Sequence, residues 1–589
     1  MAERGTLDTL GAMAGGPGRL AGRLRDLAYL PRDVALARLG YGLKRPVFAL
    51  PLYHYSLTGP HATSLVVAPA DPWPGDAALG AAVLDGRFCL DGRRFETPAP
   101  LWNPVGLSAE RATALHGFAW LRDLRAAGGD AARRAARELV TGWLAANRVW
   151  NAQTWEPLAT GQRLASWLGC YEFFAASADI TFRHRLLGAM TEQARHLHRV
   201  LPAGLTSAEL VAATKGLILA GACLPEGESW RAHGLSILRR ELRRQILADG
   251  FHAERSPARH LAVLRDLIDI RAALHRAEAQ AGRAGSGEGR PGGSVVPAEL
   301  QAAIETMAPA LRLFRHNDGG LALFNGSGEE ESWRIDMVLQ RAGGRRRAPS
   351  SAPESGFQRL RAGRTLVVLD AGAPPPPGFD REAHAGTLAF EMSVGRERVV
   401  VNCGARRGDP LWSRVQRTTA AHSTLTLADT NSSELGVEVG LGRRARVGCT
   451  HQDESEGSLW LEAEHDGYVR GFGLVHRRRL YLAADGADLR GEDRLIPKGG
   501  TARGGTYAIR FHLHPQVQAG TARDGATILL RLAKGGGWQF RMSGAASARL
   551  EPSVYLGRAG EIRRSQQIVV SGVAAHDGAT VKWALQRLP

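Results

Sequence analysis

Cysteine is scarce in this chain, and the few cysteines lie far apart. No two of them form a Cys-x-x-Cys pair, which excludes the usual cysteine-rich zinc site and the dithiol redox motif. Their odd number also argues against a disulfide framework. The five positions are Cys89, Cys170, Cys223, Cys403 and Cys449.

The chain also lacks a long apolar run and a recognisable export signal. No segment approaches the roughly 20 apolar residues that a membrane-spanning helix needs. The first fifty residues contain repeated arginines and no apolar stretch followed by a cleavage site. We therefore predict a cytoplasmic protein without a membrane span. A periplasmic location would require an export route that the sequence does not reveal.

Acidic residues are outnumbered by basic ones. Lys and Arg total 75 against 58 Asp and Glu, which gives a net charge of +17. This excess fits either a solvated surface or attraction to a polyanion, whose carboxylate or sulfate groups match the planar fork of arginine. The sequence contains no zinc-finger spacing, no RNP-like segment and no basic heptad helix, so nucleic acid is an unlikely partner.

The first half of the 589 residues has helical periodicity. From Leu115, for example, the residues Leu115, Phe118, Leu121 and Leu124 are three apart, as one helix face requires. Further helices are predicted at 161–175, 180–201, 208–222, 229–246, 257–279 and 298–314. Residues 280–297, rich in Gly, Ala, Arg and Ser, are predicted to form a flexible loop. Successive amphipathic helices predict an α-helical toroid domain over residues 1–340.

The second half has the pattern of short β-strands. Segments such as TLVVLDAG, HSTLTLADT and SQQIVVSGV alternate with Gly, Asn and Asp turns. This pattern predicts an antiparallel β-sandwich domain over residues 357–589. The basic, proline-containing residues 341–356 are predicted to connect the two domains. The expected fold class is thus α+β multidomain, with an N-terminal (α/α) toroid followed by a C-terminal antiparallel β-sandwich.

Short sequence words in both halves resemble the heparinase II/III-like polysaccharide lyases. They occur in family order across the change from helix to sheet, and this order implies the family's fold. The words are Trp102-Asn103-Pro104, LHGFAWLRDL, Trp155-Glu156-Pro157, DGFHAERSPARH, HAGTLAFE, VNCG, AAHSTL and RFHLHP.

The resemblance implies a lyase that cleaves uronate-containing chains by β-elimination. In this reaction the substrate carboxylate is neutralised, a base removes the neighbouring proton, and an acid protonates the leaving oxygen. The family tyrosine falls in a Ser-Pro-x-Tyr-His phrase, which here reads Ser256-Pro257-Ala258-Arg259-His260. Arginine stays protonated, so Arg259 can neutralise a carboxylate but cannot act as a base. The candidate catalytic residues are therefore His252, Arg259, His260 and His422.

A second set of residues is expected to bind the substrate. Trp155, Arg163 and Trp167 match the family's inner-helix segment and could form a sugar platform, because indole rings stack on pyranose faces; a buried tryptophan pair is the alternative. Arg255, in the loop before Arg259, completes the set. We also predict that five residues from both halves converge on one cleft: His252, Arg259, His260, His384 and His422.

His384 and His422 are the candidate metal ligands, because each lies at the head of a strand-like segment. Some family members hold a structural zinc beneath the cleft, so zinc is the cofactor that the resemblance implies. In this chain Asn402 stands where the family has an aspartate, and a carboxamide is a poor zinc ligand. The sequence therefore predicts that zinc is weakly held or missing.

The sequence predicts one function and leaves one alternative open. The first is a polysaccharide lyase that cleaves an acidic, uronate-containing polysaccharide by β-elimination, with a histidine in the role of the family tyrosine. The second is a catalytically degenerate protein of the same fold that binds an acidic polysaccharide without cleaving it. The replacement of tyrosine by Arg259 favours the second function.

Overall fold

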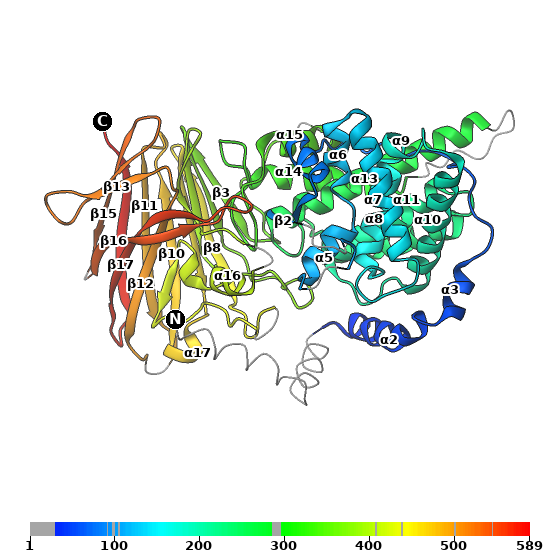
Figure 1. The fold of residues 1–589 in the computed structure, drawn as a ribbon. Coiled ribbons are helices and arrows are strands. Elements are labelled where there is room, and N and C mark those ends of the chain that lie inside the picture. Colours follow the sequence, from blue (N-terminus) through cyan, green and yellow to red (C-terminus); the bar gives the residue numbers. More distant parts are fainter. Residues whose placement is uncertain are drawn as a thin grey trace, which may run out of the picture.

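The computed structural model describes residues 30–589 apart from 91, 97–100, 104–105, 285–295, 345, 407–408, 437–439, 500–501 and 545. Helices make up the first part of the chain and antiparallel strands the second, and the two parts lie side by side (Figure 1). The predicted fold class, a helical toroid followed by an antiparallel β-sandwich, is confirmed. No helix in the described ranges is both long enough and apolar enough to cross a membrane.

The helical half contains mostly helices and one small hairpin. Its elements are α2 (Arg32–Phe48), α3 (Pro51–Leu57), α4 (Ala77–Leu84), β1 (Arg87–Leu90), β2 (Arg93–Glu96), α5 (Ala109–His116), α6 (Leu121–Ala127), α7 (Gly129–Ala146), α8 (Pro157–Gly169), α9 (Tyr171–Phe174), α10 (Ile180–Val200), α11 (Ser207–Cys223), α12 (Glu228–Gln245), α13 (Pro257–Ala284), α14 (Ala298–Leu313) and α15 (Ser332–Ala342).

Most predicted helices are present within a few residues of their expected bounds, but the one from Leu115 is interrupted. α5 ends at His116, Phe118 has a φ of 58°, and α6 begins at Leu121. Phe118 and its three apolar partners in the pattern are nevertheless all fully buried. The periodicity thus predicted the buried face correctly and the continuous helix wrongly.

The loop predicted at 280–297 begins later than expected, because α13 continues to Ala284. Residues 280–284 include alanine and arginine, which favour helix, and no proline. Residues 285–295 lie outside the described part of the chain. The predicted connection at 341–356 also begins later than expected, because α15 extends to Ala342. The apolar residues of α15 pack inward at helical spacing; they are Ile335, Val338, Leu339 and Ala342.

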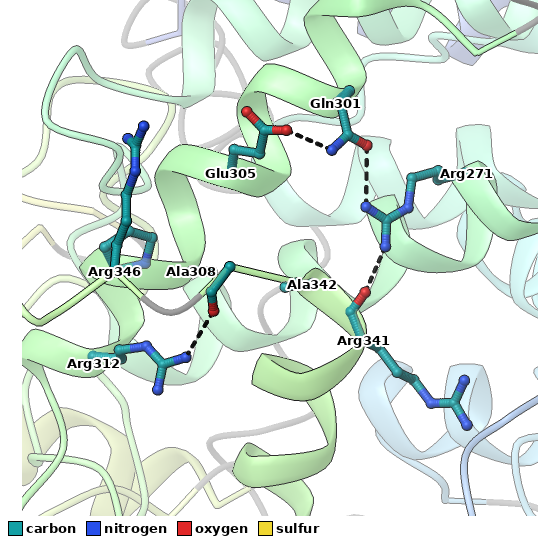
Figure 2. A pocket seen from close by; sticks show the side chains of 11 residues that line it. Arg271, Gln301, Glu305, Ala308, Arg312, Arg341, Ala342 and Arg346 are labelled. Carbon is teal, nitrogen blue, oxygen red and sulfur yellow. Dashed lines mark hydrogen bonds between the residues drawn. The ribbon is translucent and has the colours of Figure 1, made fainter.

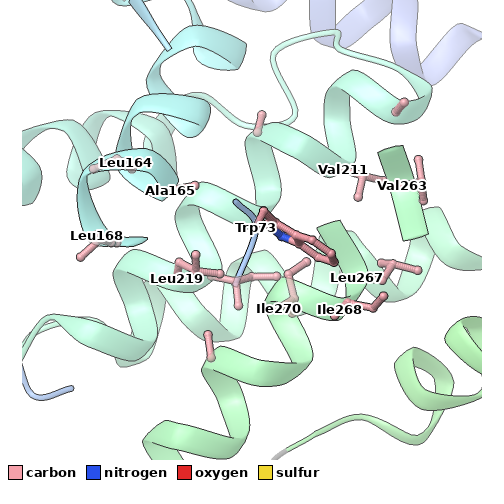
Figure 3. Close-up of a cluster of buried hydrophobic side chains, with 14 of the residues drawn as sticks. Trp73, Leu164, Ala165, Leu168, Val211, Leu219, Val263, Leu267, Ile268 and Ile270 are labelled. Carbon is pink, nitrogen blue, oxygen red and sulfur yellow. The ribbon is translucent and has the colours of Figure 1, made fainter. Parts of the chain in front are cut away.

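The centre of the helical half is α11, which is buried along nearly its whole length. It packs closely on α8 because both helices have glycine at the crossing: a Cβ on Gly216 would lie 2.1 Å from the carbonyl oxygen of Gly161. Around this crossing, Trp73 packs among aliphatic side chains of neighbouring helices, such as Leu219 and Leu267 (Figure 3). Its indole N–H donates to Asp269 Oδ1 at 2.7 Å, so its polar atom is satisfied.

Two sheets form the second half. The inner sheet has the order β16-β17-β12-β6-β5-β4-β3, with β7 paired to β12, and the outer sheet has the order β13-β14-β15-β18-β11-β10-β9-β8. The strands are β3 (Phe357–Ala362), β4 (Thr365–Asp370), β5 (Phe390–Val394), β6 (Glu397–Val401), β7 (Leu425–Leu427), β8 (Val447–Ser455), β9 (Ser458–His465), β10 (Leu474–Leu482), β11 (Asp488–Pro497), β12 (Gly505–Leu513), β13 (Gln518–Thr521), β14 (Ile528–Arg531), β15 (Gly537–Ser543), β16 (Ala546–Tyr555), β17 (Arg563–Ala574) and β18 (Ala579–Arg587).

The inner sheet is covered on both faces. Every residue of β4 is buried: Leu366 and Val368 join the apolar core of the helical half, whereas Val367 and Leu369 join the core between the sheets. This alternation follows from the two-residue period of a strand. The junction between helices and inner sheet is therefore a packed interface, and it holds most of the predicted site residues.

Candidate functional site

Asn325 links the helical half to the inner sheet at the candidate site. It lies in the loop after α14, and its side-chain amide donates to the carbonyl oxygen of Arg255 at 2.9 Å. Its side-chain oxygen accepts the backbone N–H of His384 at 3.0 Å. One side chain thus holds the loop before α13 against the segment before β5. The predicted residues Arg259, His384 and His422 lie around this link.

His384 and His422 contact each other directly. His384 Nδ1 and His422 Nε2 are 3.0 Å apart, and both side chains are buried. His422 Nδ1 donates to the carbonyl oxygen of Thr418 at 2.8 Å, so Nε2 carries the lone pair and accepts from His384. Burial lowers the pKa of His422 to about 4, which keeps it neutral at pH 7. The glycine of the HAGTL word gives the ring room, since a Cβ on Gly386 would lie 2.7 Å from it.

Arg259 lies on the first turn of α13 with its side chain directed to the junction. Its guanidinium is 3.8 Å from Glu254 Oε2 and 3.9 Å from Glu382 Oε1. The side chain of Arg259 is 21% exposed and that of Glu382 is 28% exposed. The position that the family gives to tyrosine therefore presents a partly exposed cation between two carboxylates.

A second arginine crosses the junction beside Arg259. Arg381, from the segment before β5, contacts Glu209 on α11 at 3.1 Å and Glu110 on α5 at 3.8 Å. All three side chains are partly exposed. Ion pairs between the sheet segment and the helices thus span the site, and both arginines are partly exposed.

His252 is buried beneath the loop that carries Glu254 and Arg255, and it does not reach the surface of the site. Its Nδ1 accepts the backbone N–H of Glu254 at 3.3 Å, so its Nε2 donates to Gln245 Oε1 at 3.0 Å. The side chain is 1% exposed, and burial lowers its pKa to about 3. Glu254 in turn accepts a hydrogen bond from the hydroxyl of Ser207. His252 is thus placed to hold the loop that carries Glu254 and Arg255.

His260 does not join the residues around Asn325, contrary to the predicted convergence. It follows Arg259 on α13, and consecutive helical residues point about 100° apart. Its Nε2 bonds to the carbonyl oxygen of Met307 at 2.8 Å, and its ring packs near Phe251 and Phe314. Burial lowers its pKa to about 3. The predicted catalytic role gains no support from this buried position.

The predicted sugar platform has no exposed face. Trp155, Arg163 and Trp167 are each at most 2% exposed. Arg163 donates to the carbonyl oxygens of His116 and Thr154, both at 2.9 Å. Its guanidinium is also 4.1 Å from the ring centre of Trp143. These residues join helices inside the core, which was the alternative left open by the sequence.

Arg255, the remaining predicted substrate contact, is buried between the two halves. Its guanidinium pairs with Asp370 at the end of β4 and donates to the carbonyl oxygen of Ser355 at 2.7 Å. The two paired side chains are 5% and 7% exposed. Arg255 therefore ties the helical half to the sheet, and in this position it meets no open surface.

A buried polar cluster behind the histidine pair was missed by the sequence analysis. Glu391 on β5 bonds to His316 Nε2 at 2.9 Å and accepts the side-chain amide of Asn402 at 3.1 Å. The oxygen of Asn402 accepts the backbone N–H of Ser423 at 3.0 Å, next to His422. In the sequence, Glu391 is a single acidic residue in a largely apolar segment, and this does not reveal its partners. Asn402 thus fixes the backbone that carries His422.

The zinc implied by the resemblance does not fit these residues. The facing nitrogens of His384 and His422 bond to each other, and both polar atoms of Asn402 are used in the cluster with Glu391. Among the described residues, no group of three or more His, Cys, Asp and Glu side chains is arranged to hold a metal ion.

A basic pocket lies elsewhere, between α13, α14 and α15. Its volume is about 330 Å³, and Arg271 lies in it with Gln301 and Glu305 (Figure 2). Arg271 donates to Gln301 Oε1 at 3.1 Å and to the carbonyl oxygen of Arg341 at 2.5 Å. These bonds fasten α13 to its neighbours, and the pocket contains none of the predicted site residues.

Comparisons with known proteins identify the family. The family model described as Heparinase II/III N-terminus matches residues 102–311, and the one described as Heparinase II/III-like, C-terminal matches residues 344–584. FtsZ-localized protein C of Caulobacter vibrioides is 32% identical over 549 residues, which cover 90% of this chain and 91% of that protein. The chain belongs to the heparinase II/III-like family.

Other relatives agree with this membership. Heparin-sulfate lyase of Pedobacter heparinus is 25% identical over 309 residues, 47% of this chain and 44% of that enzyme. The crystal structure of heparinase III superposes with a TM-score of 0.70 at 17% identity and covers 91% of this chain and 89% of the other. Heparan sulfate lyase HepC of Pedobacter heparinus gives a TM-score of 0.59 at 18% identity, with 94% and 87% covered. The structural likenesses establish the heparinase III-like fold.

Proposed function

We propose that this heparinase II/III-like protein binds an acidic polysaccharide at the junction and does not cleave it by a tyrosine-dependent route. The observation that carries the proposal is Arg259, a partly exposed guanidinium at the family's tyrosine position, 3.8 and 3.9 Å from two carboxylates. A guanidinium binds carboxylate or sulfate in two-point geometry but takes no proton at neutral pH.

The ion pairs at the junction suit an exchange of anions. Partly exposed pairs of this length contribute at most about 1 kcal/mol each. A carboxylate or sulfate of the ligand can therefore replace Glu382 at Arg259 and Glu209 at Arg381 with little loss. The ligand would then occupy positions that the protein's own carboxylates hold in its absence.

Elimination with His422 as the base is the second candidate. The hydrogen bond from Nδ1 to Thr418 leaves the lone pair on Nε2, and a pKa of about 4 leaves that atom unprotonated at pH 7. In this case Arg259 neutralises the substrate carboxylate, and His422 removes the proton from the carbon next to that carboxylate after His384 moves away from Nε2. The electron pair of that C–H bond forms the C=C bond, the C–O bond to the leaving sugar breaks, and the leaving oxygen takes a proton from water. A histidine would then replace the family tyrosine, as the sequence suggested.

One experiment separates the two candidates. The full chain is incubated with a panel of uronate polymers, while absorbance of unsaturated uronates and binding of labelled oligosaccharides are both followed. Oligosaccharide binding without a rise in absorbance supports the binding protein, if this binding is lost in Arg259→Ala and kept in Arg549→Ala. Rising absorbance that disappears in His422→Ala selects the lyase. Failure to bind any acidic polysaccharide overturns both candidates. Arg549 is a suitable control because it is an exposed arginine on β16, remote in sequence from the site.

We extend the proposal to a cellular location, on the basis of FtsZ-localized protein C of Caulobacter vibrioides. Its name places that protein with FtsZ, and its 32% identity extends over 90% of this chain. We include in the proposal that this chain also localises with FtsZ. The test is to image a fluorescent fusion of this chain and labelled FtsZ in the same dividing cells. A diffuse fusion in cells where the labelled FtsZ is localised would contradict this part of the proposal.

A further inference from the structure

A broad hollow lies on the outer sheet, on the face turned away from the helices. Its volume is about 730 Å³, and its walls come from β9, β10, β11, β15 and β18. Several of these strands lie at the end of the molecule opposite the helices (Figure 1). We call this hollow the sheet groove; the residues that matter here are Trp460, Arg479, Tyr481, Arg490, Arg541 and Lys582.

Two aromatic rings stand side by side in the sheet groove. Trp460 on β9 is the direct cross-strand partner of Tyr481 on β10, and their ring centres are 4.5 Å apart. Strand alternation explains their exposure, because Leu461 and Leu480 beside them point into the core between the sheets. Trp460 is 38% exposed, unlike Trp143, Trp155 and Trp167, which are buried in the helical half. Exposed aromatic faces of this kind stack on the C–H faces of sugars.

Cationic side chains surround the aromatic pair and extend beyond the acids beneath them. Arg479 is 45% exposed above Glu462, which is 13% exposed, and Lys582 is 68% exposed above Glu492, which is 18% exposed. Arg490 lies 5.6 Å from the ring centre of Tyr481. The outermost layer of the groove is thus positively charged, and its surface ion pairs are weak enough for another anion to displace.

We propose that the sheet groove is a second binding site, for an acidic oligosaccharide. The aromatic pair provides the stacking surface for sugar rings, and Arg479, Arg490 and Lys582 bind their carboxylate or sulfate groups. An acidic peptide offers the same charges without the stacking, so the aromatic pair decides in favour of a saccharide. This inference does not rest on the proposed function, because the groove shares no residue with the junction.

The test uses the full chain and a labelled heparin hexasaccharide, with binding followed by fluorescence anisotropy. It is run in the wild-type protein and in Arg259→Ala, which removes the junction cation. Trp460→Ala is expected to weaken the groove affinity about tenfold in both backgrounds. Lys582→Glu changes an exposed side chain and is expected to weaken binding without affecting folding. The matched controls, Trp333→Ala and Arg549→Ala, alter an exposed tryptophan and an exposed arginine outside the groove and are expected to bind as the wild type does.

Three results would overturn the proposal. One is unchanged binding in both Trp460→Ala and Lys582→Glu, each with a wild-type circular dichroism spectrum. Another is equal affinity for the hexasaccharide and for poly-glutamate, together with no effect of Trp460→Ala, because the groove would then recognise charge alone. Loss of binding in Arg259→Ala with no further loss in Trp460→Ala would keep the junction site and reject the groove.

Discussion

Arg259 and His260 show how much one helical step decides. They are neighbours in the sequence, yet Arg259 faces Glu254 and Glu382 at the junction, whereas His260 bonds to Met307 inside the helical core. The sequence words identified the right turn of α13. They could not give the rotation of the helix about its axis, because that rotation is fixed by the packing of α13 on its neighbours.

Glu382 is expected to compete with the ligand for Arg259. Its carboxylate lies 3.9 Å from the guanidinium in the ligand-free protein. Glu382→Gln removes this charge and leaves a side chain of similar size, so the affinity for an acidic oligosaccharide should rise several-fold, corresponding to about 0.5–1 kcal/mol. Isothermal titration calorimetry at low salt measures this change.

The matched substitution for Glu382→Gln is Glu551→Gln, which removes a partly exposed carboxylate paired with Arg549 on β16. It should leave the affinity unchanged. Equal effects of both substitutions would mean that only the net charge of the protein matters, and would contradict direct competition at Arg259.

The contact between His384 and His422 was predicted, although neither residue lies on a strand. Both were placed at the head of a short β segment, whereas in the structure His384 lies in the loop before β5 and His422 lies just before β7. The facing nitrogens, Nδ1 of His384 and Nε2 of His422, are 3.0 Å apart. Glu391 was missed, since nothing in the sequence distinguishes a buried, hydrogen-bonded glutamate from one at the surface. Trp155 and Trp167 were open to two interpretations because an inner helix of a toroid is buried on more than one side.

At the scale of elements, close helix packing depends on residues that carry no chemical signal. α8 and α11 approach each other because glycine occupies the crossing on both helices. The 3.6-residue period predicts which helices exist and which faces are buried. It does not predict which pairs of helices come into backbone contact. For this reason the individual helices were predicted well, whereas their arrangement was predicted only at the level of the fold class.

Gly216→Ala is expected to destabilise the protein. Alanine favours helix over glycine by about 1 kcal/mol. The new Cβ would lie 2.1 Å from the backbone oxygen of Gly161, so the two helices would have to separate. Overpacking of this kind costs about 1–3 kcal/mol and outweighs the gain in helix propensity. Urea unfolding followed by circular dichroism should show a lower midpoint.

Gly282→Ala provides the control at the level of the element. Gly282 lies near the end of α13, and an added Cβ would meet nothing within 4 Å. Only the propensity term remains, so the free energy of unfolding should stay constant or rise by up to about 1 kcal/mol. A Gly216→Ala protein as stable as Gly282→Ala would contradict the assigned helix crossing.

At the scale of the whole molecule, both halves bury neutral histidines. Burial lowers the pKa of five of these histidines to about 3: His116, His196, His252 and His260 in the helical half, and His512 in the sheet half. It lowers the pKa of His422 to about 4. In the unfolded chain a histidine has a pKa of about 6.5.

Stability should therefore fall as the pH decreases from about 6.5 towards 4. In this range the unfolded chain binds protons that the folded chain excludes, so each buried histidine removes up to about 1.4 kcal/mol per pH unit. Above pH 7 the effect should vanish. Urea unfolding at pH 7.5, 6.5 and 5.5 measures the slope, and His252→Gln should reduce it by about one proton. A stability independent of pH across these values would contradict the buried neutral state.

The ion pair of Arg255 and Asp370 joins the two halves, and it gives a further prediction for the whole molecule. Both side chains are buried, and Arg255 also donates to the carbonyl oxygen of Ser355. Arg255→Ala would leave Asp370 as an unpaired buried carboxylate, which costs about 3–5 kcal/mol. Burial already raises the pKa of Asp370, and loss of the arginine would raise it further. Asp370 would then become protonated, and thus neutral, at a higher pH in the variant.

The stability difference between wild type and Arg255→Ala should consequently narrow as the pH falls, because protonation removes the unpaired charge from the variant. Adding Asp370→Asn to Arg255→Ala should recover part of the lost stability at pH 7.5, since an amide is less costly to bury than a carboxylate. Arg549→Ala, which breaks an exposed pair, should change the free energy of unfolding by less than about 1 kcal/mol. If Arg255→Ala unfolded at the wild-type urea concentration, the buried pair would contribute no net stability, and the other contacts across the junction, such as those of Asn325, would hold the two halves together.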